Sequence, residues 1–126
     1  MGTDPVRPHR LAEAEGRRLC RELYWTPTTV APLPGEVDSN FLVASSAGEQ
    51  FVLKVASPST RRDSLELQDQ VLSRLAAAEV GPFPTAVRSR RGRTLEEVEV
   101  GSSMRGVRLL TFLPGYRLVE LSSRPP

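Results

Sequence analysis

The sequence has little cysteine, little histidine and no long apolar run, and each shortage excludes a class of protein. One cysteine and one histidine in 126 residues exclude an internal disulfide framework and a histidine-cluster metal site. The longest apolar runs are a few residues, too short for a membrane-spanning helix. The N-terminus also lacks the apolar core of a secretory signal. We therefore expect a soluble, cytoplasmic domain.

The charge balance gives no sign of a polyanion partner. There are 17 basic and 15 acidic residues, which leaves a net charge of only +2. Sixteen of the basic residues are arginine, and the only lysine is Lys54. A lysine ammonium is a compact point charge, whereas an arginine guanidinium is a planar fork. The single lysine is either a position that needs such a point charge or chance within a biased composition.

Hydrophobic periodicity and turn residues predict eight elements in one domain, with 39% apolar residues. The predicted elements are a helix over 10–24, strands over 28–31, 40–44 and 51–56, a helix over 60–79, and strands over 85–88, 95–100 and 107–112. Gly92 and the segment 101–106 supply turns. This order predicts an α+β fold, with an antiparallel sheet of about five strands, one long helix packed on it and an additional N-terminal helix.

Side-chain periodicity places the polar residues of two elements. Alternation within 51–56 puts Lys54 inside an apolar strand, on the same face as Val52. In the helix over 60–79, Gln68 falls near the centre of a broad apolar side, and Glu66 projects from the opposite side. The residues expected on that apolar side are Leu65, Leu67, Val71, Leu72, Leu75, Ala76 and Ala78.

Four segments carry a resemblance to a known family. They read Leu-Pro-Gly-Glu-Val-Asp-Ser-Asn-Phe over 33–41, Phe-Val-Leu-Lys-Val over 51–55, Leu-Glu-Leu-Gln over 65–68, and Val-Arg-Leu-Leu-Thr-Phe-Leu-Pro-Gly over 107–115. In this order and spacing they resemble the N-terminal lobe of the aminoglycoside phosphotransferase and choline kinase-like family, most closely its hydroxylysine kinase branch. The resemblance implies a protein-kinase-like small lobe over 10–113, after a tail over 1–9. Residues 114–126 would be the hinge and the start of a linker to a C-terminal lobe that this sequence lacks.

The resemblance also implies a nucleotide site. Lys54 matches the strand lysine that binds nucleotide phosphates in kinase-like folds, and its alternative is a lysine at a strand edge whose charge reaches solvent. The loop with Gly35, Ser39 and Asn40 matches a phosphate-covering loop, although an ordinary turn would have the same composition. The hinge, whose backbone would bond the base, matches Thr111, Phe112 and Leu113.

The helix partner of the lysine departs from the protein-kinase pattern. Protein kinases pair this lysine with a glutamate of the long helix. Here we expect Gln68 to be its neighbour, with a weaker hold than a carboxylate would give. Two alternatives stay open, namely that Gln68 bonds a nearby backbone group and that Glu66 is the partner.

The residues for catalysis in this family are missing. They are an aspartate in a His-Gly-Asp-type loop, a later asparagine and a metal-binding aspartate, but the only histidine is His9, and eleven residues follow Gly115. We therefore expect no catalytic residue, no metal ligand and no kinase activity in this chain alone. The expected nucleotide is ATP or GTP with Mg2+, with the metal ligands and the site for a small hydroxyl-bearing substrate, such as an amino acid or aminoglycoside, in the absent lobe. The lobe surface left uncovered predicts self-association.

Two other functions compete with a nucleotide-binding lobe. One is a non-catalytic protein-interaction domain with the same fold. The other is a nucleic-acid-binding module, whose arginines would be Arg88, Arg90, Arg91 and Arg93. Acidic neighbours over 96–99 and the absence of interleaved aromatic residues count against that module, and we expect no nucleic-acid partner. The Cys20 thiol is expected to be buried and inert.

Overall fold

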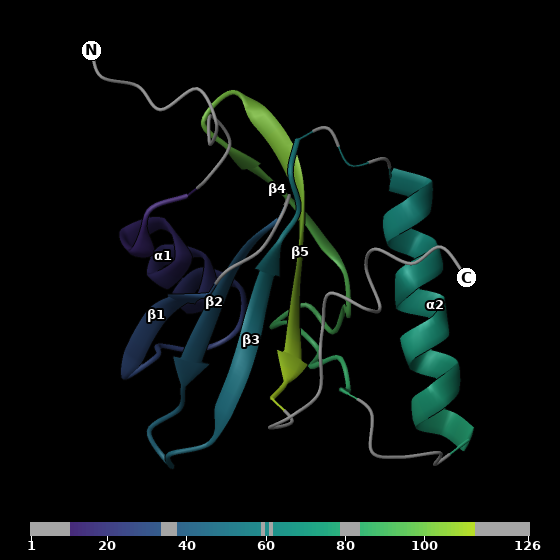
Figure 1. The fold of residues 1–126 in the computed structure, drawn as a ribbon, viewed down its shortest axis with the longest axis horizontal. Coiled ribbons are helices and arrows are strands. Elements are labelled where there is room, and N and C mark those ends of the chain that lie inside the picture. Colours follow the sequence, from purple (N-terminus) through teal and green to yellow (C-terminus); the bar gives the residue numbers. More distant parts are fainter. Residues whose placement is uncertain (1–10, 34–37, 59, 61, 79–83, 113–126) are drawn as a thin grey trace.

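The computed structural model describes residues 11–33, 38–58, 60, 62–78 and 84–112. They form a five-stranded antiparallel sheet with one helix on each face (Figure 1). The elements are α1 (Glu13–Leu23), β1 (Thr29–Leu33), β2 (Ser39–Ala44), β3 (Gln50–Val55), α2 (Arg62–Ala78), β4 (Glu96–Val100) and β5 (Ser103–Thr111). The strand order is β1-β2-β3-β5-β4. The predicted α+β fold is confirmed, including the number of strands and the two helices.

Two predicted details of the last strands were wrong. The segment 85–88 is no strand and makes a single bridge, Ala86 to Leu110. Two backbone hydrogen bonds, from the Val87 N–H to the Leu109 carbonyl and from the Thr111 N–H to the Thr85 carbonyl, join it to β5 before the chain turns back over 89–92. The turn expected over 101–106 is much shorter, since β5 already pairs with β4 from Ser103 onward. Gly101, at φ +63°, makes the tight reversal that leaves residues 103–106 free to join the sheet.

The main apolar core lies between the sheet and α1. Alternate residues of the central strands face this core, and the register aligns them across the sheet. Its fully buried members from the helix and the strands include Leu19, Cys20, Phe41, Val43, Leu53, Val55, Val107 and Leu109. Gly16 lets α1 come close to β2, because a Cβ at this position would lie 2.9 Å from three ring atoms of Phe41.

The second helix packs on the opposite face along a narrower line than the sequence predicted. Leu65 and Leu72 are buried, and Leu65 lies over Gly106 of β5. Leu67 and Val71, expected on the inward side, are 61% and 41% exposed. The contact follows positions 65, 68 and 72, and at 3.6 residues per turn Leu67 and Val71 fall to one side of that line. The broad inward side was therefore overestimated.

Within the described ranges, neither helix combines the length and the apolar character that crossing a bilayer requires.

The Gly16–Phe41 contact leads to a stability prediction. Gly16→Ala is expected to lower the free energy of unfolding by about 1 kcal/mol, because overpacking against the ring outweighs the gain in helix propensity. Urea denaturation of the variant measures this change. In a Phe41→Leu background the same substitution should cost less, since the smaller side chain leaves room. An increase in stability from Gly16→Ala alone would contradict the close contact.

Candidate functional site

A row of polar residues crosses the face of the sheet that α2 covers. The strand register aligns Asn40 of β2 with Lys54 of β3, and Lys54 with Arg108 of β5. Residues directly opposite each other in antiparallel strands project from the same face. Lys54 and Arg108 are only 6% and 4% exposed. The sheet thus holds two adjacent basic side chains almost out of water.

An apolar row lies beside the polar one, two residues away on each strand. It consists of Leu42, Val52 and Leu110, aligned by the same register. Val52 and Leu110 are buried, whereas Leu42 is half-buried. A polar row for charged groups therefore adjoins an apolar row that ends in a partly exposed leucine.

Lys54 forms an ion pair with Asp38. Its Nζ atom lies 2.8 Å from Asp38 Oδ2, and the side chains are 7% and 16% exposed. Asp38 directly precedes β2, so its backbone is not part of the strand. Alternation places Asp38 on the face of Asn40 and Lys54. The ion-pair partner of the Lys54 ammonium is thus Asp38, at the start of the strand that pairs with β3.

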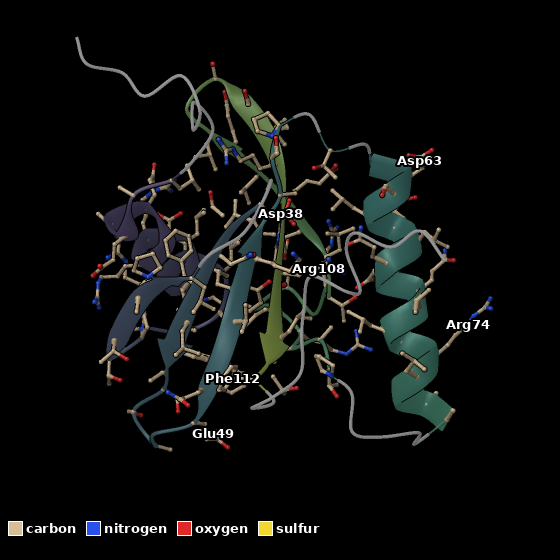
Figure 2. The ribbon with its side chains drawn as sticks, in the orientation of Figure 1. Asp38, Glu49, Asp63, Arg74, Arg108 and Phe112 are labelled. Carbon is tan, nitrogen blue, oxygen red and sulfur yellow. The ribbon has the colours of Figure 1, made fainter. Side chains whose placement is uncertain are left out.

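Gln68 bonds Arg108 rather than the predicted Lys54. Its Oε1 accepts a hydrogen bond of 2.6 Å from Arg108 Nη2, which joins α2 to β5. The expected pairing of Lys54 with Gln68 was therefore wrong, because the arginine on the neighbouring strand lies between the lysine and the helix line that carries Gln68. Glu66, the open alternative, is exposed on α2. Arg108 points from β5 into the space beside α2 (Figure 2).

Arg108 is the most strongly desolvated of these groups. Burial lowers the pKa of Arg108, and the carboxylates of Asp69 and Asp38 act against that shift. Asp69 is fixed on α2, where its Oδ2 accepts a hydrogen bond of 2.7 Å from Thr94 Oγ1. The two basic side chains are thus neutralised by two carboxylates, one before β2 and one on α2.

Three buried polar atoms in this region have no hydrogen-bond partner within the part of the chain that the structure describes. They are Asn40 Oδ1, Asp69 Oδ1 and Arg108 Nη1. Buried polar groups are almost always paired, so unpaired ones in one place are a sign of a binding region. Asn40 and Arg108 flank Lys54 on either side. Arg108 Nη1 lacks an acceptor, whereas Asn40 Oδ1 and Asp69 Oδ1 lack a donor, so a ligand that offers both kinds of group would satisfy these atoms.

The structure separates the predicted residues Ser39 and Asn40. Ser39 pairs with Val55 and is buried on the α1 face, where its Oγ accepts a hydrogen bond of 3.1 Å from the Leu11 N–H. Its side chain therefore lies across the sheet from Lys54. Only its backbone is left for a phosphate, whereas the Asn40 side chain lies beside the lysine. Gly35, predicted with them, lies outside the described residues.

The predicted hinge residues lie at the end of β5, three residues from Arg108. That separation corresponds to about 10 Å along a strand. The Thr111 N–H donates to the Thr85 carbonyl at 2.9 Å, and the Phe112 N–H donates to the Gln50 carbonyl at 3.3 Å. Both N–H groups are thus engaged within the protein, which leaves the carbonyl side of this segment for a base. Leu113, the third predicted residue, lies outside the described residues.

Two residues of the polar site were not singled out by sequence reasoning. Arg108 shows the same signal that identified Lys54, a charged residue within an apolar strand. Asp38 is in phase with Asn40, two residues before it. Alternation could have found both, but their pairing needed the register between strands that are far apart in the sequence.

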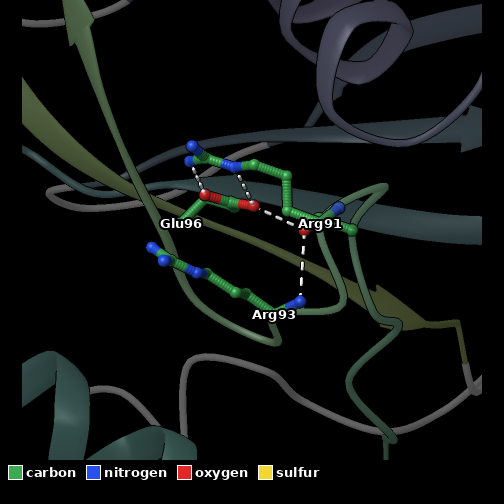
Figure 3. Close-up of polar contacts among 4 residues, drawn as sticks. Arg91, Arg93 and Glu96 are labelled. Atoms are coloured by element: carbon green, nitrogen blue, oxygen red, sulfur yellow. Dashed lines mark hydrogen bonds and ion pairs between the residues drawn. The ribbon is translucent and has the colours of Figure 1, made fainter.

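The arginine cluster over 88–93 makes contacts within the protein. Arg91 Nη2 lies 2.5 Å from Oε1 of the fully buried Glu96, and Ser89 Oγ donates to Glu96 Oε2 (Figure 3). Arg90 Nη2 donates to the Arg21 carbonyl of α1 at 2.9 Å. Arg88 Nη1 donates to the Gly92 carbonyl at 2.9 Å. These bonds fasten the loop to itself and to the end of α1.

The remaining candidate groups have structural surroundings. Cys20 is buried, its Sγ donates to the Trp25 carbonyl at 3.3 Å, and burial raises the pKa of the thiol to about 11, as an inert cysteine requires. Among the residues that the structure describes, no group of three histidine, cysteine, aspartate or glutamate side chains could hold a metal ion.

Two kinases of known structure share this architecture. The amicoumacin kinase hAmiN, in complex with AMP-PNP, Ca2+ and Ami, matches 86% of this chain and 33% of its own at a TM-score of 0.68 and 18% identity. A microcompartment-associated aminopropanol kinase matches 73% of this chain and 28% of its own at a TM-score of 0.60 and 22% identity. The sheet with its two helices is therefore a kinase-like fold.

The sequence comparisons define the family. The model of the phosphotransferase enzyme family matches residues 29–124, so the chain belongs to this family. Hydroxylysine kinase of Danio rerio is 34% identical over 132 residues, covering 99% of this chain and 37% of the relative. Hydroxylysine kinase of Xenopus laevis is 29% identical over 126 residues, covering 91% and 34%. The predicted resemblance is confirmed, and the chain spans about a third of the length of these relatives.

The buried Glu96 leads to a pH prediction. Its bonds to Arg91, together with that from Ser89, hold the pKa of the carboxyl below its usual range despite burial. A lowered pKa in the folded state means a stabilisation that is present above the unfolded pKa, about 4.3. It is lost as the pH falls through the folded pKa. Glu96→Gln should therefore reduce the free energy of unfolding at pH 7 by about 2 kcal/mol and flatten its decline below pH ~4.

Urea denaturation between pH 3 and pH 7 measures both effects. Glu99→Gln is the matched control, because Glu99 is an exposed glutamate of the same strand. It should leave the profile close to that of the parent. Equal profiles for the Glu96 and Glu99 variants would show that the buried carboxylate adds nothing.

Proposed function

We propose that this chain binds a nucleoside triphosphate on the α2 face of its sheet and is the nucleotide-binding lobe of a small-molecule phosphotransferase. The observation that carries the proposal is Lys54, buried in a polar row on the face shared with α2 and paired with the Asp38 carboxylate. A buried lysine is costly unless it has a charged partner to bind. A phosphate is such a partner, and the family is one of phosphoryl transfer.

The phosphates would bind at the polar row and the base further along the sheet. Lys54 would exchange Asp38 for a phosphate oxygen, and the Asn40 amide, its direct neighbour, would donate to the same group. The base would pack at the half-buried Leu42 end of the apolar row. The carbonyls near Thr111 and Phe112 lie about 10 Å away along β5, at the base end of such a ligand.

The proposed nucleotide is ATP or GTP with Mg2+. The kinase hAmiN was solved with AMP-PNP and Ca2+, a triphosphate analogue and a divalent ion. Such an ion neutralises the phosphate charge when bound. We propose that its ligands and the catalytic base belong to a second lobe, since the relatives are about three times as long as this chain. This chain alone would then bind nucleotide without transferring phosphate.

The proposed reaction takes place only with that second lobe present. A hydroxyl of a small substrate attacks the γ-phosphorus, the bond to the β,γ-bridging oxygen breaks, and the nucleoside diphosphate leaves. The hydroxyl proton passes to the base of the second lobe. The hydroxylysine, amicoumacin and aminopropanol kinases among the similar proteins support a hydroxyl-bearing amino acid or aminoglycoside-like acceptor. We propose a cytoplasmic location, where the nucleotide is available.

Removal of the ammonium tests the proposal directly. Lys54→Met is expected to weaken binding of ATP or GTP by about tenfold or more, since a charge-assisted contact to phosphate is lost. Amide NMR titration with the Mg2+ nucleotide detects even millimolar binding. Arg74→Met is the matched control, because it also removes one positive charge but from the exposed side of α2 that faces away from the sheet (Figure 2). Unchanged affinity in the Lys54 variant would favour a non-catalytic interaction domain.

The predicted self-association has a candidate surface. Leu67 and Val71 lie one turn apart on α2 and are exposed, and paired apolar side chains of this kind favour contact with another surface. We expect Leu67→Glu combined with Val71→Glu to shift sedimentation velocity from a larger species toward a monomer. A parent protein that is already monomeric at ~0.5 mM would contradict self-association, since weak dimers form by then.

A further inference from the structure

The contacts of Arg108 are not explained by the proposed binding of phosphate at Lys54. The guanidinium uses Nη2 on Gln68, but Nη1 is buried and has no hydrogen-bond partner within the described ranges. It lies directly across from Lys54 on the neighbouring strand. Like charges opposite each other repel, so the arrangement is unfavourable unless an anion is shared between them.

Asp38 is the anion that both basic side chains attract. It forms the ion pair with Lys54 at 2.8 Å, and its charge also acts on Arg108. Since Asp38 precedes β2, its backbone is not fixed by the strand ladder. Asp69, the other carboxylate near Arg108, is already held by Thr94. Asp38 is therefore the carboxylate whose charge acts on both basic side chains at once.

Phosphate binding at Lys54 would displace the Asp38 carboxylate, which then needs another cationic partner. Asp38 and a phosphate compete for the same ammonium, and two anions left side by side in a buried site would repel each other. We propose that Arg108 is a positioning residue that receives the Asp38 carboxylate on its free Nη1 when Lys54 binds phosphate. This inference rests on the proposed function. It predicts that the effect of Arg108 on phosphate binding depends on the charge of Asp38.

A double-mutant cycle tests this dependence, and the single lysine provides a direct signal. Protein labelled with 15N-lysine has one side-chain ammonium signal, from Lys54. Titration with inorganic pyrophosphate, which has no base, follows the arrival of phosphate at that ammonium. In the parent, Arg108→Met should weaken pyrophosphate binding by about fivefold, a coupling of the size seen between contacting residues. Asp38→Asn alone should strengthen it.

The decisive comparison is Arg108→Met in the Asp38→Asn background. Without the Asp38 charge there is no carboxylate to receive, so the Arg108 substitution should change the affinity by less than about twofold. Arg108→Gln provides a second neutral variant that retains an amide donor and the length needed to fill the site. It should behave like the methionine variant in both backgrounds, and amide spectra establish that each variant is folded.

The outcomes separate this inference from the function on which it rests. An equal loss in both backgrounds would mean that Arg108 contacts phosphate itself or acts only through the fold, and it would overturn the transfer of Asp38. An unchanged affinity in both backgrounds would overturn it as well. A Lys54 signal that pyrophosphate does not move in any variant would overturn the proposed phosphate site together with the inference. If Arg108→Met weakens pyrophosphate binding only while Asp38 is charged, the proposed transfer of Asp38 to Arg108 is supported.

Discussion

The repulsion between two buried basic side chains is the constraint on which the polar face of this sheet depends. Lys54 and Arg108 lie opposite each other on β3 and β5, and both are largely removed from water. Burial and like charge both disfavour this arrangement. It is held by three groups from two other parts of the chain, namely Asp38 before β2, and Gln68 and Asp69 on α2. The charges of Lys54 and Arg108 thus constrain both the position of α2 and the conformation at the start of β2.

The sheet separates stability from chemistry by the alternation of its strands. Odd-numbered residues of β5 face the α1 core, and even-numbered ones face α2 and the polar row. The same division separates Ser39, which anchors the chain before α1, from Asn40, which flanks Lys54.

The sequence predicted much of this arrangement because most of it is local. The order of the main elements, the placement of Lys54 within a strand and the apolar faces of the central strands follow from period and turn residues. The pairing of Gln68 with Arg108 spans 40 positions, and it depends on how far α2 sits along β5. The helical period alone could not show where α2 sits along β5. It also could not show that Leu67 and Val71 lie beside the line of contact through positions 65, 68 and 72. The bond from the Leu11 N–H to Ser39 was hidden for the same reason.

The register of β2 against β3 has a consequence for how the length of this chain can change. A shift by one residue would move Phe41 out of the core and Asn40 away from Lys54 at the same time. Insertions within β2 are therefore doubly penalised. The turn between β2 and β3 is different, because residues 46–50 are exposed and Gly48 takes a positive φ with open space around it. Added residues there leave every pair of the ladder in place, so this turn is where homologous chains can differ in length at least cost.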